Sequence, residues 1–357
     1  MMHLGLSLSP FGHHPAAWRQ PGAMRQALDF GQLAAQVQKA EEGALDFVLL
    51  GDAPARRPCV DLPPQTTPFE PTTLVAALAT RVKKIGFVVT AGSAQHELYN
   101  LARRFASLDL ISQGRIGWNL VASGPTISWN KEYVAVVTAL WGSWDADAFV
   151  YDKSAGRFFE PNKMRVLEHR GEHFTVRGPL NVNPSSQGKP LIAQALTAET
   201  FDFVAHSTEL LLVTNASQEA GRGMVIEARQ LLASQGRDPA EVRSLANVVP
   251  WIGATRAEAW NRFHQINELS SQESLESRQG YDVIGTATDI ADALQESFER
   301  GEFDGFTILP PIAPVDLHAF VDCVVPELRR RGLFRAHYEG AALRHHLSLK
   351  PSRRPAR

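Results

Sequence analysis

Short apolar runs alternate along the chain with stretches in which apolar residues recur at helical spacing. The runs predict buried strands over 3–9, 47–50, 85–90, 115–121, 191–195, 210–214, 245–252 and 305–309. The helical spacing predicts helices over 31–43, 70–82, 101–111, 131–141, 198–206, a stretch ending at 235, 256–269, 286–300 and 317–331. Because helices follow the strands throughout, we predict an α/β fold, a (β/α)8 TIM barrel with insertions. A doubly wound sheet is the alternative, but the first strand is not followed by GxGxxG.

The stretch from Leu101 to Ser123 shows one such unit in full. Its helix stops at Ser112-Gln113-Gly114, where Gly114 suits the left-handed position that follows a helix. A strand with Asn119 near its end comes next, and Trp118 should point to the opposite side of that strand. Polar residues at the carboxyl ends of barrel strands are where this fold places its chemistry.

No shift in composition divides the chain, so we predict a single domain over 1–349. An insertion at about 145–188 breaks the strand–helix alternation and contains a small hairpin. The proline-rich segment 53–69 is predicted to be a functional loop, and the polar segment 270–282 a mobile one. The basic tail 350–357 is expected to be disordered.

Composition restricts the classes of binding partner and the cellular compartment that we expect for this protein. A net charge of −2 gives no reason to expect nucleic acid or a membrane as a partner. We expect a cytoplasmic protein. The chain has only two cysteines, Cys59 and Cys323, and the sequence shows no apolar run of membrane length and no leader. The sequence shows neither metal-ligand spacing nor a GxSxG nucleophile motif.

Four stretches carry a resemblance to a known family. They are GHHPAAWRQP, EPTTLVAALATRVKKIGFVVTAGSA, SQGRIGWNLVAS, and DGFTILPP followed by VVPELRRRGLFRAHYEGAALRHHL. The chain resembles bacterial-luciferase-like flavin-dependent monooxygenases, in the branch of nitrilotriacetate and desulfurisation monooxygenases. The resemblance implies a luciferase-like TIM barrel that uses reduced FMN and O2 to oxygenate a small organic substrate. It also implies a separate NAD(P)H:flavin reductase and a homodimer or homotetramer, for which the apolar face of helix 70–82 is a candidate contact.

Positions that match the family place the flavin over the carboxyl-end mouth of the barrel. The predicted cofactor-binding residues are Asp52, Thr90, Ser93, Asn119, Ser123, Gln194 and Thr197. Each of these short polar residues is also a common turn or cap residue, and their clustering at successive strand ends favours binding. His13 and His14 are the candidates for proton transfer, with ordinary loop contacts as the alternative. His96 is a weaker candidate of the same kind, and Glu70 is expected to favour its own helix terminus.

Two departures from the family concern the flavin phosphate. Relatives have a longer segment after strand four, with a His and a Tyr, whereas here only Gly124 to Asn130 separate the strand from its helix. After strand five, Leu196-Thr197 replaces a Gly-Ser pair, and Glu199 brings negative charge. Lys131 is the candidate replacement for the lost contacts. Two alternatives therefore stay open: a non-catalytic barrel subunit, and a flavin- or deazaflavin-dependent reductase.

Overall fold

Parallel strands close into a barrel that carries the rest of the chain. The computed structural model describes residues 1–21, 23, 29–52, 69–204, 206–272, 275, 278–350 and 352. The barrel strands are β1 (His3–Leu8), β2 (Phe47–Leu50), β3 (Gly86–Gly92), β4 (Ile116–Val121), β9 (Leu191–Ala195), β10 (Leu210–Val213), β11 (Arg243–Ile252) and β13 (Gly305–Ile308). Their order is β10-β9-β4-β3-β2-β1-β13-β11, and pairing of β10 with β11 closes the ring. The predicted TIM barrel, with these strands, is confirmed.

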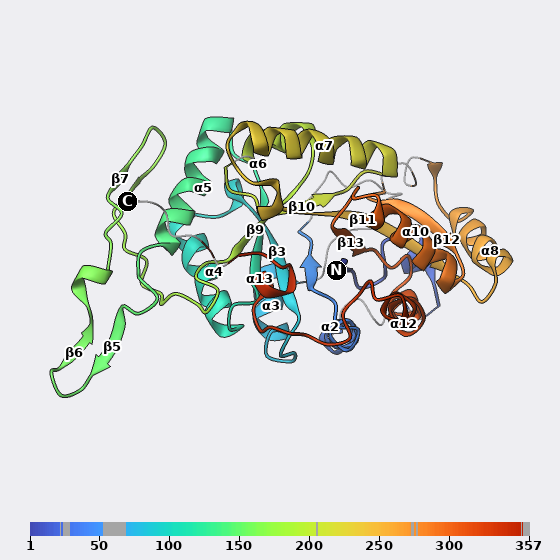
Figure 1. Ribbon diagram of the computed structural model, residues 1–357, viewed down its shortest axis with the longest axis horizontal. Coiled ribbons are helices and arrows are strands. Elements are labelled where there is room, and N and C mark those ends of the chain that lie inside the picture. Colours follow the sequence, from blue (N-terminus) through green and yellow to red (C-terminus); the bar gives the residue numbers. More distant parts are fainter. Residues whose placement is uncertain are drawn as a thin grey trace.

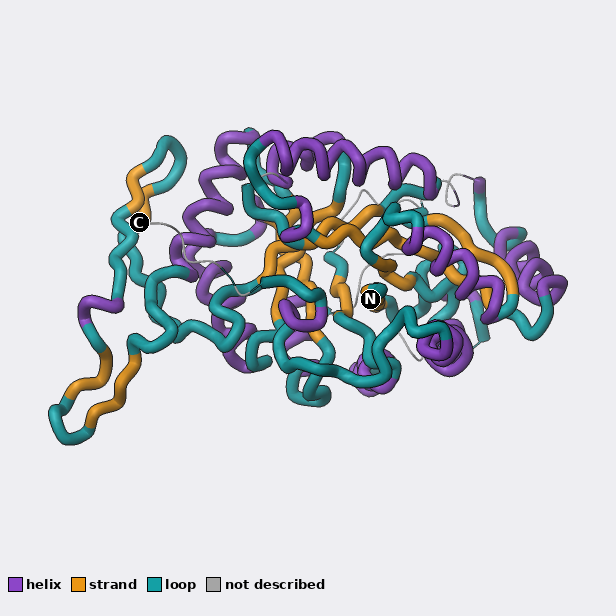
Figure 2. Tube along the Cα trace, viewed as in Figure 1, coloured by secondary structure: helices purple, strands orange, loops and turns teal. Residues whose placement is uncertain are grey.

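Helices surround the barrel (Figures 1 and 2). They are α2 (Phe30–Glu42), α3 (Pro71–Leu78), α4 (Leu98–Ile111), α5 (Ile127–Trp141), α6 (Phe201–Val204), α7 (Gln218–Ser234), α8 (Arg256–Asn267), α10 (Ala287–Glu299), α11 (Val315–Ala319), α12 (Val325–Arg330) and α13 (Leu343–His346). Gly114 is left-handed, with φ of +87°, but the position directly after the α4 cap, predicted for Gly114, is occupied by Gln113 with φ of +63°. The proline-rich loop lies outside the described residues, except for Phe69, as does Cys59.

Alternation along the strands separates an inner from an outer core. Leu49, Val88 and Leu245 belong to a cluster inside the barrel. Their neighbours Val48, Val89 and Ala246 belong to the larger cluster between strands and helices. Since successive side chains of a strand point to opposite faces, membership of these clusters fixes which residues face the barrel interior.

Several elements differ from the sequence predictions. Helix α5 begins at Ile127, not Lys131, because Thr126 caps it by accepting a hydrogen bond from the Trp129 N–H. Helix α3 ends at Leu78 instead of continuing to residue 82. A further strand, β12 (Tyr281–Gly285), begins within the segment that was predicted to be mobile, and it pairs with the far end of β11. Pairing with β11 orders Tyr281 and Asp282, which the composition of that segment does not reveal.

The insertion forms two small antiparallel sheets, where one hairpin was predicted. They are β5 (Phe149–Asp152) with β6 (Arg157–Phe159), and β7 (His169–Arg170) with β8 (Thr175–Val176). Figure 1 shows β5 and β6 projecting beyond the barrel. The turn between β7 and β8 is fastened to α5, because Glu132 accepts hydrogen bonds from the backbone N–H groups of His173 and Phe174, each at 3.0 Å.

The C-terminal segment closes the amino-end of the barrel, a role that the sequence analysis did not assign. Leu343 and Leu347 are buried in the interior cluster. Beside them, Arg344 forms a two-point ion pair with Glu209, at 2.6 and 2.8 Å, with little exposure of either side chain. The segment is therefore part of the folded core, in contrast to the basic tail, of which only Lys350 and Ser352 are described.

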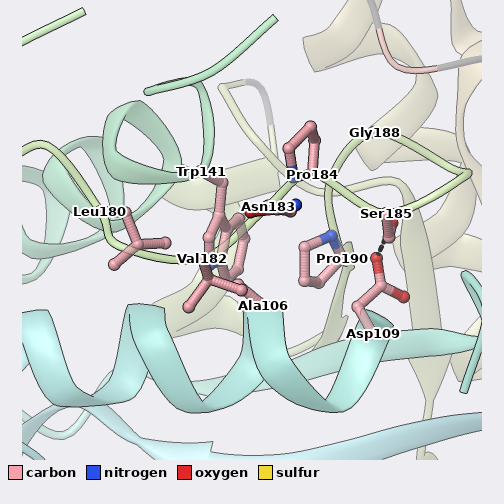
Figure 3. A pocket seen from close by; sticks show the side chains of 10 residues that line it. All are labelled: Ala106, Asp109, Trp141, Leu180, Val182, Asn183, Pro184, Ser185, Gly188 and Pro190. Carbon is pink, nitrogen blue, oxygen red and sulfur yellow. Dashed lines mark hydrogen bonds between the residues drawn. The ribbon is translucent and has the colours of Figure 1, made fainter. Parts of the chain in front are cut away.

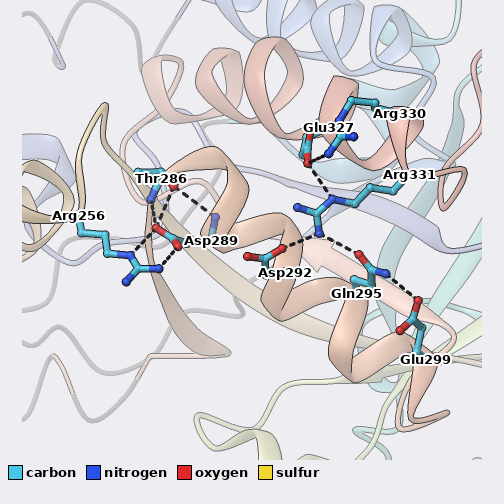
Figure 4. A network of polar contacts seen from close by, with 9 residues as sticks. All are labelled: Arg256, Thr286, Asp289, Asp292, Gln295, Glu299, Glu327, Arg330 and Arg331. Carbon is cyan, nitrogen blue, oxygen red and sulfur yellow. Dashed lines mark hydrogen bonds and ion pairs between the residues drawn. The ribbon is translucent and has the colours of Figure 1, made fainter.

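Polar networks fasten α10 to its neighbours (Figure 4). At its start, Asp289 accepts hydrogen bonds from the Thr286 N–H and hydroxyl and also binds the Arg256 guanidinium. Together these contacts hold the pKa of the Asp289 carboxyl well below its usual value. Further along, Arg331 reaches Asp292 at 2.7 Å and Glu327 at 2.8 Å, which links α10 to the end of α12. These contacts lie on the outside of the barrel.

Candidate active site at the barrel mouth

One side of the barrel mouth is formed by Thr90 and Asn119. These residues are paired in register on β3 and β4, and their alternation with Val89 and Trp118 directs both into the barrel. The Asn119 Nδ2 donates a hydrogen bond to Thr90 Oγ1 at 2.9 Å. Asn119 Oδ1 is buried and has no hydrogen-bond partner among the described residues. A buried amide oxygen without a donor is uncommon in a folded protein, so this atom is positioned to receive a ligand group or water.

The opposite side carries Asn247 and Thr307, which the sequence analysis missed. In the closed order of strands, β11 lies across from β3, and β13 lies across from β4. Asn247 and Thr307 are paired in register, and Asn247 Oδ1 and Thr307 Oγ1 are both buried without a partner. A sequence signal was present, since each is a polar residue within an otherwise apolar strand, at an inward position.

His13 lies at the mouth with both ring nitrogens engaged. Its Nδ1 donates to the Pro310 carbonyl at 3.3 Å, so Nε2 accepts from the hydroxyl of Ser7, an inward residue of β1, at 2.9 Å. Burial lowers the pKa of His13 from 6.5 to about 4, which keeps the ring neutral at pH 7. Proton transfer by His13 would therefore require exchange of one of these hydrogen bonds.

His14 fastens the first loop to α8. Its Nδ1 accepts from the Ala16 N–H at 3.1 Å, so Nε2 donates to Asn267 Oδ1 at 2.9 Å. The ring also meets Trp251 edge-on, and burial lowers the pKa of His14 to about 4. Both nitrogens have protein partners, so the structure gives His14 a role in holding the loop.

Ser93 and Ser123 join the loops that follow β3 and β4. The Ser93 hydroxyl donates to Asn130 Oδ1 at 2.6 Å and accepts from the Ser123 N–H at 3.1 Å. The Ser123 hydroxyl accepts from the Ala94 N–H and donates to Gln95 Oε1. These hydroxyls shape the rim beside Asn119, and their hydrogen-bonding capacity is largely used within the protein.

Asp52, Glu70 and His96 lie near one another at the rim. Partial burial, and then the nearby Glu70 carboxylate, raise the pKa of Asp52, whereas burial and Arg104 lower the pKa of His96. Glu70 accepts hydrogen bonds from the N–H groups of Thr72 and Thr73, so it caps α3. The prediction that Glu70 serves its own helix terminus is confirmed. Asp52 is exposed and directly precedes the segment 53–68, which is not described.

Gln194 and Thr197 do not join Asn119 inside the mouth. Gln194 alternates with the inward Ala193 and therefore faces the helices, where its Oε1 accepts from the Thr208 hydroxyl at 3.1 Å. Gln194 was predicted to bind the cofactor because it lies near a strand end, but that place does not fix the side on which its side chain lies. Thr197 forms a capping box with Thr200, and its hydroxyl donates to Glu199 at 2.7 Å.

The start of α5 receives a histidine from the insertion. The Ser128 hydroxyl lies 3.0 Å from His173 Nε2 and 3.1 Å from the Thr126 hydroxyl. Along the chain, the short segment after β4 contains no histidine. In space, the turn between β7 and β8 brings His173 to this position, and Lys131 lies one turn further along the helix.

A small pocket outside the mouth lies between α4 and the segment that precedes β9 (Figure 3). It is lined by Asp109, Trp141, Leu180, Ser185 and Pro190, among others. Asp109 accepts hydrogen bonds from Ser185, from Gln187 at 2.6 Å and from the Ile116 N–H at 3.0 Å, while burial raises its pKa to about 6. These bonds fasten the segment to α4, so the pocket is a packing feature at a distance from the inward polar residues.

The chain is an α/β barrel with polar side chains at the carboxyl ends of its strands. Enzymes of this fold have their active sites at that end. The sequence model of the family described as "Luciferase-like monooxygenase" matches residues 11–304. The N-acetyl-S-(2-succino)cysteine monooxygenase of Bacillus subtilis (strain 168) is 33% identical over 438 residues, covering 99% of this chain and 98% of that protein. Nitrilotriacetate monooxygenase component A of Aminobacter aminovorans is 31% identical, covering 98% and 96%. The structure of EDTA monooxygenase from Chelativorans sp. BNC1 superposes with a TM-score of 0.84 at 28% identity, covering 98% and 99%.

The chain therefore belongs to the luciferase-like monooxygenase family. The predicted resemblance to the nitrilotriacetate monooxygenase branch is confirmed, and with it a monooxygenase activity that uses reduced FMN. The alignment with the Bacillus protein extends over 438 positions, whereas this chain has 357 residues, so that relative contains residues with no counterpart here. None of the helices in the described part of the chain is long and apolar enough to cross a membrane.

Proposed function

We propose that reduced FMN binds at the carboxyl-end mouth of this barrel, with its ring against Asn119 and Thr90, and that a small organic substrate is oxygenated there. The unpaired Oδ1 of Asn119 carries this proposal. A flavin ring has N–H groups that this oxygen can accept from, and Thr90 holds the amide so that its oxygen stays available. When bound, reduced FMN supplies the electrons that activate O2.

The remaining residues at the mouth support binding more than proton transfer. The inward positions below Asn119 are apolar, including Val88 and Leu191, so they exclude water from beneath the ligand. His13 holds the first loop and the Ser7 hydroxyl beside this space. Because its ring is neutral at pH 7, His13 can accept a proton at Nε2 only after the Ser7 hydroxyl turns away.

For the phosphate of FMN, we propose the start of α5, with Ser128 and His173 as side-chain donors. Supporting this position are the helix N-terminus itself and the family precedent of a histidine after strand four. Lys131, on the next turn, is the alternative donor. Calorimetric titration with FMN and with riboflavin tests the proposal, since only FMN carries the phosphate. His173→Ala should weaken the binding of FMN and leave the affinity for riboflavin unchanged. Lys131→Ala should have this effect only if the lysine is the donor. If neither variant affects FMN, the phosphate binds elsewhere.

The proposed flavin contact is tested by anaerobic titration with reduced FMN. Asn119→Ala should weaken binding by about tenfold to a hundredfold, because loss of one buried polar contact costs about 1–3 kcal/mol. Asn100→Ala, at an exposed position of α4, is the matched control and should change nothing. An unchanged affinity of Asn119→Ala, with an unchanged melting temperature, would exclude Asn119 from the site. Substrate-dependent O2 consumption with a flavin reductase then tests the oxygenation itself.

We also propose a cytoplasmic protein that forms a homodimer or homotetramer. The apolar face of α3 does not support association, because Leu74, Val75 and Leu78 are buried within the monomer. A better candidate contact is the sheet of β5 and β6, where Tyr151 is 54% and Phe158 is 60% exposed. Light scattering at micromolar concentration provides the test, and a monomeric mass would contradict the proposal.

A further inference from the structure

Unpaired polar atoms line both sides of the barrel mouth. Asn119 Oδ1 lies on β4, and Asn247 Oδ1 and Thr307 Oγ1 lie on β11 and β13, on the opposite side. Asn247 is 3% exposed and Thr307 is fully buried. Apolar residues would pack at these inward positions without such a cost, as they do at Leu49 and Leu212. The protein thus keeps polar groups at inward positions where they need a hydrogen-bonding partner, which a ligand can supply.

The chemistry of the three atoms restricts what can satisfy them. The two amide oxygens accept hydrogen bonds and cannot donate them, and the Thr307 hydroxyl can do both. A fitting ligand group must therefore present N–H or O–H donors toward both sides of the mouth. Two-electron reduction of a flavin adds an N–H to the ring at N5, where the oxidised ring has an acceptor. The oxidised ring thus offers fewer donors, and its additional acceptor cannot bond an amide oxygen.

We propose that Asn247 and Thr307 form a second flavin-binding wall, opposite Asn119, that favours the reduced over the oxidised ring. This inference rests on the proposed function, because it requires the flavin to bind at this mouth. Selectivity of this kind suits an enzyme that takes up reduced flavin from a separate reductase and must release the oxidised form. Asn247 supplies the discriminating acceptor, and Thr307 supplies a hydroxyl that can adapt to either ring.

The experiment compares near-isosteric variants that delete one polar group each. Asn247→Leu and Thr307→Val are titrated anaerobically with reduced FMN and, separately, with oxidised FMN, and their melting temperatures are measured without flavin. We expect Asn247→Leu to lower the affinity for reduced FMN by about tenfold and to leave the affinity for oxidised FMN nearly unchanged. Thr307→Val should raise the melting temperature of the flavin-free protein while weakening reduced FMN. Thr307→Ser keeps the hydroxyl and should restore the affinity.

A matched control separates the loss of a ligand contact from the gain in stability that follows when an unpaired polar group is removed. Thr138 on α5 also has a buried Oγ1 without a partner among the described residues, but it lies outside the barrel. Thr138→Val should raise the melting temperature and leave both FMN affinities unchanged. If Asn247→Leu does not fold, Asn247→Ala replaces it with the same expected ratio of affinities.

The outcomes distinguish this inference from the proposed function. If Asn247 and Thr307 variants bind both forms as the wild type does, while Asn119→Ala loses reduced FMN, the second wall is wrong and only water satisfies these atoms. Equal weakening of reduced and oxidised FMN binding by Asn247→Leu would overturn the selectivity. If the wild type binds no reduced FMN, the proposed function itself fails.

Discussion

Leu343→Ala tests whether the C-terminal segment is a structural plug of the barrel. Leu343 is fully buried in the interior cluster, so truncation removes its packing and leaves a cavity beneath the strands. Buried leucine-to-alanine changes cost about 2–5 kcal/mol, depending on how far the surroundings collapse. The surroundings here are strands of a closed barrel, which cannot move inward independently, so we expect the upper half of that range. Urea unfolding of the purified variant measures the loss directly.

A second substitution makes this test specific to the contact. A methyl group added at Gly86 would lie 2.6 Å from Leu343 Cδ1, so Gly86→Ala alone should destabilise the barrel by about 1–3 kcal/mol through overpacking. In the Leu343→Ala background the added methyl enters the vacated space. The double variant should therefore lose less stability than the two single losses combined, a coupling of about 0.5–3 kcal/mol.

Gly5→Ala provides the control for this cycle. The three atoms nearest to its added methyl would all belong to the Phe47 ring, the closest at 2.4 Å, so Leu343→Ala should not rescue it. Strict additivity of Gly86→Ala and Leu343→Ala would refute the reasoning, because it would mean that Leu343 does not fill the space beneath Gly86. A stability loss below 1 kcal/mol for Leu343→Ala would refute the plug itself.

Two further predictions concern charge. Burial lowers the pKa values of His14 and His346 from 6.5 to about 4, so the native state binds fewer protons than the unfolded chain between these values. The free energy of unfolding should fall as pH drops from 6.5 to 4, by up to ~1.4 kcal/mol per pH unit for each histidine, and His346→Gln should reduce the slope measured by urea unfolding. Glu209→Gln leaves the buried Arg344 without its counter-charge and should cost about 3–5 kcal/mol, and a melting temperature equal to that of the wild type would contradict this.

The sequence by itself determined the barrel, because each buried strand and each amphipathic helix shows its period locally. It also determined that Asn119 faces the barrel interior, since Trp118 beside it had to occupy the outer face. It could not place Gln194, whose side depends on strand register. The inward polar positions of Asn247 and Thr307 were visible in the sequence, but their juxtaposition arises only when β11 and β13 pair. His173 reaches α5, and Leu343 fills the barrel, through contacts between segments far apart along the chain. No local pattern encodes such contacts, so only the tertiary structure decided them.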